Sequence, residues 1–193
     1  MDQGSGVEDA AGVCIVTALQ EVVGELERHA AAGGWDQPAA LYALVSTADL
    51  IAREPGLADT LADATSLTPV QQDEVDAEHL EAFLQQIAWP PEVAGVAAVV
   101  ERLVLPPEAE GEVPDDAAAA ATYAAAHPER QEVRIVAAAT RDGEAWCTLR
   151  FRAYDEDDKV LGATDLVPPL VDLLRATLDL DQTDGAPEES TDE

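Results

Sequence analysis

The sequence is poor in residues that build metal, disulfide and cofactor sites. It contains two cysteines, Cys14 and Cys147, and three histidines in 193 residues. Cysteines this far apart form neither the disulfide framework of a small secreted domain nor a closely spaced zinc-binding pair. H-E-x-x-H, the glycine-rich nucleotide loops and G-x-S-x-G are missing. The acidic run 155–158 lacks the spacing and glycine of a calcium loop, so we expect a solvated loop there. We therefore predict no metal and no cofactor, and the sequence assigns no catalytic residue.

Basic residues are equally scarce. Ten lysines and arginines stand against 40 acidic residues, which gives a net charge of −30, and Lys159 is the single lysine. A field of this sign repels nucleic-acid phosphates and anionic lipid headgroups. We therefore predict no direct nucleic-acid binding and no membrane binding. The charge itself is explained by solubility, or by an acidic mimic of a nucleic acid, which would need acids spaced like phosphates along one surface.

Long apolar runs are also absent. No stretch reaches the roughly 18 apolar residues of a membrane helix, and the acidic N-terminus lacks the basic and apolar regions of a signal peptide. We therefore expect a cytoplasmic protein. Hydrophobic residues make up 47% of the chain and aromatic residues 4%, so the core should be aliphatic. The composition predicts a disordered N-terminus (1–9), one domain (10–180), and a disordered tail (181–193) with six acids and no base.

Hydrophobic periodicity predicts the helices. Apolar residues recur every three or four positions from Ile15 to Leu26, and the pair Gly33 and Gly34 ends this first helix. Further helices are expected after a cap at Ser46, from Asp76 to about residue 87, in the alanine-rich segment 117–126, and at 164–180.

Short valine-rich or apolar runs bounded by turn residues predict the strands. These runs cover 40–45 and 94–105, whereas 65–76 is expected to be a loop. A hairpin is expected around Asp142 and Gly143, because Asp-Gly favours a tight two-residue turn.

The two-residue turn sets a register for this hairpin. Ala139 then lies opposite Trp146, and Val136 lies opposite Leu149. One hairpin face holds Val136, Ala138, Cys147, Leu149 and Phe151, and the other holds Ile135, Trp146, Thr148, Arg150 and Arg152.

The order of elements predicts an α+β fold. We expect a mostly antiparallel sheet of about four strands with helices packed on one face, including amphipathic helices at the N-terminal and C-terminal ends. In topology, a helix, a curved antiparallel sheet and a closing helix resemble the secretion-chaperone type of fold.

Several segments in order also resemble a known family. They are DQPAALYALVSTADLIAREP, LTPVQQDE, IAWPPEVAGVAAVVERLVLPP, AAHPERQEVRIVAAATRDG and DLVPPLVDLLRATL, and together they span roughly residues 12–180. The chain is similar to a family of uncharacterised actinobacterial proteins whose propionibacterial prototype is known only by a locus tag. The resemblance implies an acidic cytoplasmic actinobacterial protein, and it carries over no activity.

Glu101 and Arg102 interrupt the apolar strand at 94–105. Neighbouring strand residues point to opposite faces, so these two cannot form a working pair with each other. Glu101 could form an ion pair across the sheet with Arg134, Arg150 or Arg152. Arg102 could pair with any of the surplus acids. We favour structural ion pairs over a catalytic carboxylate.

Trp146, Arg150 and Arg152 alternate along one strand and so share a face. They could form an arginine patch that recognises carboxylate or phosphate, with the tryptophan as an aromatic wall. The alternative, which we favour, is that these arginines pair with the protein's own acids or lie under a helix.

Two main functions follow from these observations. The first is a non-enzymatic protein-interaction or chaperone-like adaptor module with a protein partner, which also allows a homodimer. Its site is expected around Glu101, Arg102, Trp146, Arg150 and Arg152. The second is a small-molecule-binding protein or enzyme with a pocket around the 146–152 strand and Glu101. We favour the first, because the chain carries no catalytic motif.

Overall fold

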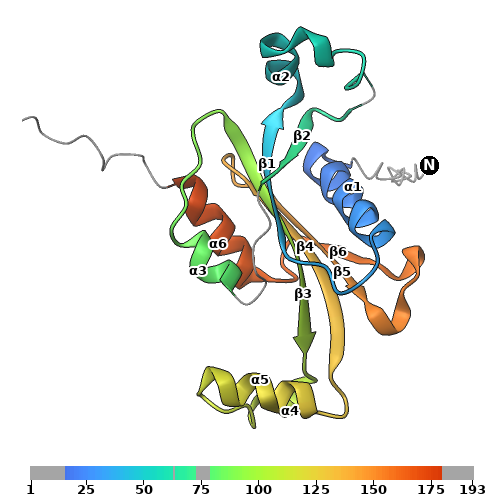
Figure 1. Ribbon diagram of the computed structural model, residues 1–193, viewed down its shortest axis with the longest axis vertical. Helices are drawn as coiled ribbons and strands as arrows, with labels where there is room; N and C mark the ends of the chain where they lie inside the picture. Colours follow the sequence, from blue (N-terminus) through green and yellow to red (C-terminus); the bar gives the residue numbers. More distant parts are fainter. Residues whose placement is uncertain (1–15, 63, 73–78, 180–193) are drawn as a thin grey trace, which may run out of the picture.

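The computed structural model describes residues 16–62, 64–72 and 79–179. Within these residues, six antiparallel strands form one sheet in the order β2-β1-β3-β4-β5-β6 (Figure 1). The strands are β1 (Ala40–Ser46), β2 (Leu67–Gln71), β3 (Val93–Val104), β4 (Gln131–Thr140), β5 (Ala145–Phe151) and β6 (Leu161–Ala163). The α+β class, the antiparallel sheet and the two central strands are confirmed, but the sheet is larger than the predicted four strands.

The strands that the sequence does not predict form the two edges of the sheet. β2 occupies part of the segment 65–76, for which a loop is predicted, and it pairs with β1. Its Pro69 cannot donate a backbone hydrogen bond, which an edge strand tolerates. β6 has three residues and pairs with β5. Both segments are extended because a neighbouring strand pairs with them. Their own residues show little of the alternating apolar pattern that predicts a strand.

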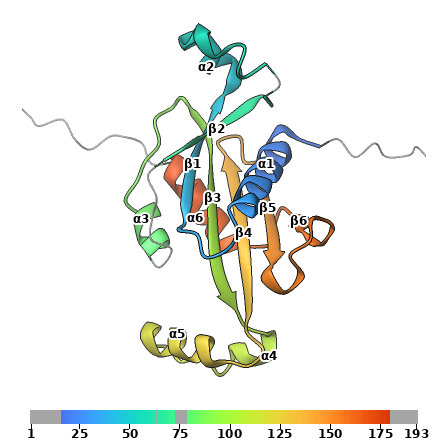
Figure 2. The same ribbon diagram turned by 45° about the vertical axis from the view of Figure 1, so that its right-hand side comes forward.

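Helices cover both faces of the sheet, which corrects the prediction that they pack on one face. α1 (Ala18–Ala32) lies on one face, and α3 (Leu80–Leu84) and α6 (Pro168–Asp179) lie on the other (Figure 2). The central strands explain this arrangement, because residues 96–100 of β3 and 133–139 of β4 are buried without interruption. Strands that are apolar on both sides need cover on both sides.

α1 confirms the first predicted helix. Thr17 and Gln20 form a capping box in which each side chain accepts a hydrogen bond from the other residue's backbone N–H. Gly34 follows the helix with a φ of +82°, a conformation that favours glycine. The buried stripe of α1 packs on the sheet with Tyr42, Leu44, Ala97, Val99, Val136 and Ala138.

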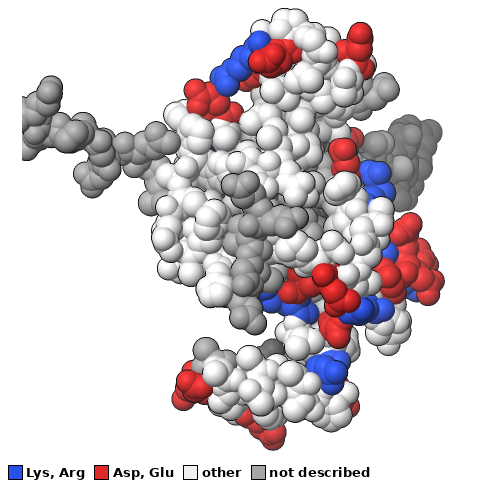
Figure 3. Space-filling view, in the orientation of Figure 1, with Lys and Arg blue, Asp and Glu red and all other residues white. Residues whose placement is uncertain are grey.

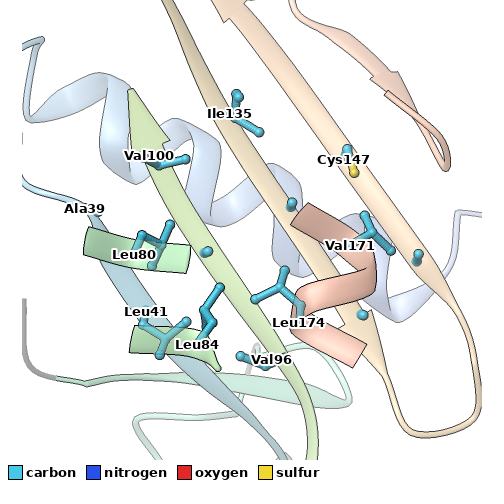
Figure 4. Packing of buried hydrophobic residues seen from close by; sticks show 14 of the residues in the cluster. Ala39, Leu41, Leu80, Leu84, Val96, Val100, Ile135, Cys147, Val171 and Leu174 are labelled. Carbon is cyan, nitrogen blue, oxygen red and sulfur yellow. The ribbon is translucent and has the colours of Figure 1, made fainter. Parts of the chain in front are cut away.

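The second core cluster lies between the sheet and the helices α3 and α6. Leu80 and Leu84 of α3 and Val171 and Leu174 of α6 cover side chains from several strands, as Figure 4 shows. These strand residues are Leu41, Val96, Val100, Ile135 and Cys147. α6 confirms the predicted C-terminal helix. Of the helix predicted from Asp76, residues 76–78 lie outside the described residues.

The β4–β5 hairpin has a three-residue loop, 141–143, where the sequence predicts two residues. The N–H of Thr140 donates to the carbonyl of Glu144 at 3.0 Å, and the N–H of Gly143 donates to the carbonyl of Thr140 at 3.1 Å. Gly143 has a φ of +91°. A turn that ends in a left-handed glycine is the usual form of a three-residue hairpin loop, and Asp-Gly fits it as well as the two-residue form.

The extra loop residue shifts the hairpin register by one position. Trp146 lies opposite Ala138, and Thr148 lies opposite Val136. Because side chains alternate between faces, the shift places Val136 and Ala138 on the same face as Trp146, Thr148 and Arg150. The predicted division of the two hairpin faces is therefore wrong, although Trp146 and Arg150 do share a face.

The remaining elements lie at the periphery. The predicted cap at Ser46 is confirmed, since its side chain accepts a hydrogen bond from the N–H of Asp49. In Figure 1, α4 and α5 lie across the far end of the β3–β4 ribbon. These elements are α2 (Thr47–Arg53), η1 (Pro55–Leu57), α4 (Pro107–Glu110), α5 (Ala117–Ala126), η3 (Arg152–Tyr154) and η4 (Asp157–Lys159).

Two further sequence expectations concern the ends of the chain and membranes. The segments 1–9 and 181–193, for which disorder is predicted, lie outside the described residues. Across the residues that are described, no helix has both the length and the apolar character needed to cross a bilayer.

Candidate functional site

Charged residues form a row across three neighbouring strands on the face that α1 covers. The register places Glu101 of β3 opposite Arg134 of β4, and it places Arg134 opposite Arg150 of β5. Arg102 points to the other face, where its Nη2 donates to Glu81 of α3 at 2.9 Å. The two side chains therefore form no ion pair with each other, although Nη1 of Arg102 donates to the backbone carbonyl of Glu101 at 3.4 Å.

Both carboxylate oxygens of Glu101 have partners. Arg134 donates to Oε1 from Nη2 at 2.8 Å and from Nε at 3.2 Å. The backbone N–H of Asp36 donates to Oε2 at 2.8 Å. Arg134, one of the arginines that the sequence offers as a partner, is 1% exposed and also donates to the carbonyl of Gly34. Glu101 therefore fastens the loop after α1 to the sheet.

The aromatic residue of this site is Trp35. Its ring centre lies 4.4 Å from the guanidinium carbon of Arg134 and 5.5 Å from that of Arg152, so both cations lie against the ring. Its Nε1 donates to Asp155 at 2.9 Å. Trp146, the aromatic wall of the sequence hypothesis, packs against the core cluster under α1 instead.

Arg150 contacts three carboxylates. Its Nε and Nη2 donate to the two oxygens of Glu27 on α1, with an Nη2–Oε2 distance of 3.0 Å. It also donates to Asp155 at 3.1 Å and to Asp157 at 2.8 Å. These hydrogen bonds, led by that of Glu27, raise the pKa of Arg150 further above its ordinary value. Arg150 is a permanently charged residue that is 2% exposed.

Arg152 lies nearer the surface and also forms ion pairs with acidic side chains. Its Nη1 and Nη2 each donate to one oxygen of Asp36 at 2.9 Å, and Nη1 also contacts Glu132. The hydrogen bond from Arg152 lowers the pKa of Asp36. The hydrogen bond from Trp35, followed by that from Arg150, likewise lowers the pKa of Asp155.

We call these residues the arginine cluster: Glu27, Trp35, Asp36, Glu101, Glu132, Arg134, Arg150, Arg152, Asp155 and Asp157. Three arginines face six carboxylates, so the cluster is net negative and its N–H groups are bound largely by the protein's own acids. Such a site is poorly suited to recognising an anion. Among the described residues, no group of histidine, cysteine or acidic side chains is arranged to hold a metal ion.

Six members of the cluster are not anticipated from the sequence, namely Glu27, Trp35, Asp36, Glu132, Asp155 and Asp157, and the last two lie in the run that is expected to be a solvated loop. Glu27 lies on the buried side of α1 together with Leu26, and an acid within an apolar helical stripe is a signal that it pairs with a cation. Trp35 and Asp36 directly follow the glycines that end α1. Asp36 has a φ of +65°, which no pattern in the sequence indicates.

A cavity of about 130 Å³ adjoins the arginine cluster. It lies beside the C-terminal end of α1, and its polar lining includes Gln37, Tyr42, Gln71, Glu101 and Arg134. Within the described part of the chain, Nη1 of Arg134 is buried without a hydrogen-bond partner, and burial raises the pKa of Tyr42. The cavity is large enough for a few waters or for a small polar molecule.

A larger cavity of about 320 Å³ lies on the opposite face, and we call it the α3–α6 cavity. The ion pair between Glu81 and Arg102 contributes to its lining, together with Pro168 and Pro169. Its apolar side chains come from the sheet, from α6 and from the segment before α6: Val100, Ile135, Leu166, Val167, Leu170 and Leu173. Phe83 of α3, which is 39% exposed, lines a separate cavity with Ile87 and Trp89.

A family model described as PPA1309-like protein matches residues 19–179, which is most of the chain. The chain belongs to the PPA1309-like protein family. The match covers both the arginine cluster and the α3–α6 cavity, and the family description names no activity. Neither the curated proteins nor the solved structures include a significant match.

Proposed function

We propose that this protein is a non-enzymatic interaction module that binds a protein partner through the face around the α3–α6 cavity. The observation that carries the proposal is an open cavity lined by six apolar side chains on a protein with a net charge of −30. In Figure 3 the surface over α3 and α6 is largely uncharged, whereas acidic and basic side chains gather elsewhere on the same view. Four of these side chains, those of Leu166, Val167, Leu170 and Leu173, are half-buried, and a partly exposed apolar surface with charges at its edge is typical of an interaction site.

The contacts within the arginine cluster also favour an interaction site on the α3–α6 face, because they assign the cluster a structural role on the other face of the sheet. Arg150 is buried against Glu27 and Arg134 is buried against Glu101. These charges hold α1 and the following loop on the sheet, so their role is structural. The protein-interaction site is therefore proposed on α3 and α6, while Arg102 is the one residue of the sequence hypothesis that lines it.

The test compares what three forms of the tagged protein capture from native cytosol. Leu170→Asp places a charge in the cavity, and an acid in the first turn favours α6. Because Leu170 also packs against the core cluster, the circular dichroism spectrum and Tm of the variant must first match those of a folded protein. Leu103→Asp makes the same change at an exposed position on the opposite face. The proposal expects one stoichiometric partner that the wild type and Leu103→Asp capture and that Leu170→Asp loses. It also expects a photoreactive residue at position 173 to crosslink to that partner. Equal capture by the two variants would contradict it.

The 130 Å³ cavity favours a second candidate function, the binding of a small polar molecule. The specific observation is the buried Nη1 of Arg134, which lacks a partner within the described residues, beside the lining groups of Tyr42 and Gln71. Thermal-shift screening of polar metabolites should then find a stabilising compound whose effect disappears in Tyr42→Phe. If no compound separates the wild type from Tyr42→Phe, this candidate is wrong.

A further inference from the structure

The lining of the α3–α6 cavity combines apolar walls with one acid that stays accessible. Leu170 and Leu173 of α6 line it together with Glu81, whose side chain is 47% exposed although it pairs with Arg102. A volume of 320 Å³ lies at the lower end of the about 300–1,000 Å³ of small-molecule pockets. That size suits one or two apolar side chains of a peptide.

The charge of the whole molecule restricts what can approach this cavity. A net charge of −30 attracts cationic chains and repels acidic ones at separations up to about a Debye length, beyond which salt screens the field. A second copy of this chain carries the same charge, so its approach is opposed. An apolar surface beside an accessible acid, on a strongly acidic protein, is complementary to a basic amphipathic segment.

We propose that the partner segment is a basic amphipathic helix that inserts an apolar side chain into the α3–α6 cavity and places a lysine or arginine beside Glu81. The proposal rests on the proposed function and adds the chemistry of the partner. Glu81 supplies the cationic contact, and the wall formed by Leu170 and Leu173 supplies the apolar contact.

The experiment measures the binding of three labelled helical peptides by fluorescence anisotropy at two salt concentrations. One peptide has leucines on one face and lysines on the other, the second replaces its leucines with serine, and the third replaces its lysines with glutamate. The protein forms are the wild type, Leu170→Asp and Glu81→Gln. Leu103→Asp and Glu25→Gln are the controls with the same charge changes, and Glu25 is exposed on α1.

The expected result is that the leucine–lysine peptide binds the wild type best. Leu170→Asp should raise its Kd by roughly tenfold or more, which corresponds to about 1.4 kcal/mol. Glu81→Gln should raise the Kd by about two- to fivefold at low salt and by less at high salt. The two control variants should bind like the wild type.

Three other results would overturn the proposal in distinguishable ways. If the serine–lysine peptide binds equally well, or if Leu170→Asp has no effect, the attraction is non-specific and the cavity binds nothing. If the leucine–glutamate peptide binds equally well and Leu170→Asp abolishes both, the docking face stands but the partner is not basic. If Leu170→Asp converts a concentration-dependent dimer into a monomer, the face binds a second copy instead.

Discussion

Arg150 and Glu27 form a buried ion pair that joins β5 to α1. The Nη2–Oε2 distance is 3.0 Å, and the residues are 2% and 4% exposed. The two partners differ in what else they contact. Arg150 also binds Asp155 and Asp157, whereas Glu27 makes its ion pair with Arg150 within the described residues. Loss of Arg150 therefore leaves an uncompensated buried charge, and loss of Glu27 does not.

We expect this asymmetry to appear in the free energies of unfolding of variants that lack one partner or the other. Arg150→Met should lower the free energy of unfolding by about 3–5 kcal/mol, because the Glu27 carboxylate then stays buried under α1 without a cationic partner. Glu27→Gln should lower it by roughly 1–3 kcal/mol, because Arg150 keeps two acids. Urea denaturation of both variants measures the difference. In Glu27→Leu/Arg150→Met much of the loss should be recovered, and equal losses in the two single variants would contradict the argument.

The contact between Asp36 and Arg152 predicts a pH dependence. The hydrogen bond from Arg152 holds the pKa of Asp36 below its ordinary value. The contact between Asp36 and Arg152 therefore contributes fully to the stability of the folded protein above the unfolded pKa of about 3.9. This contribution is lost as the pH falls through the lower pKa of Asp36 in the folded protein. The difference in Tm between the wild type and Asp36→Asn should be constant from about pH 7 to pH 5 and should shrink below about pH 4.

The matched control for this pH dependence removes its cause. In an Arg152→Gln background, the difference in Tm between the proteins with and without Asp36→Asn should no longer shrink below about pH 4, because the contact that lowers the pKa of Asp36 is gone and burial, which raises it, remains. A loss of this difference on acidification that persists in this background would show that another group is responsible.

The elements that could be predicted are those whose signal lies in their own residues. The apolar stripe of α1 and the valine-rich run of β3 are of this kind. β2 and β6 could not be predicted, because a neighbouring strand makes them extended. The hairpin register depends on whether Gly143 ends a two-residue or a three-residue loop, and Asp-Gly is compatible with both.

The same distinction holds for the arginine cluster. The pair of Glu101 with Arg134 could be foreseen as one of three options, because both residues lie on strands. The pair of Glu27 with Arg150 depends on how α1 is placed across the sheet, which residue spacing alone does not determine. The contact of Trp35 with Arg134 depends on the loop geometry after Gly34, where Asp36 takes a left-handed conformation.

Cys147 should be unreactive in the folded protein. It is fully buried in the core cluster beneath α6, and burial raises the pKa of its thiol, so little thiolate exists at neutral pH. In a Cys14→Ser background, a disulfide reagent should label the native protein at least roughly 100-fold more slowly than the urea-unfolded protein. Labelling at equal rates would mean that α6 does not stay packed over β5.

Two glycines should respond in opposite directions to the same added methyl group. A Cβ on Gly95 of β3 would lie 2.7 Å from the carbonyl oxygen of Ala139, whereas a Cβ on Gly24 of α1 would meet nothing within 4 Å. Gly95→Ala should therefore lower the free energy of unfolding by roughly 1–3 kcal/mol, because β3 and β4 must separate. Gly24→Ala should raise it by about 0.5–1 kcal/mol, because alanine favours a helix interior. Urea denaturation of the two variants beside the wild type measures both effects. Stabilisation by Gly95→Ala would contradict the close contact between β3 and β4 at this position.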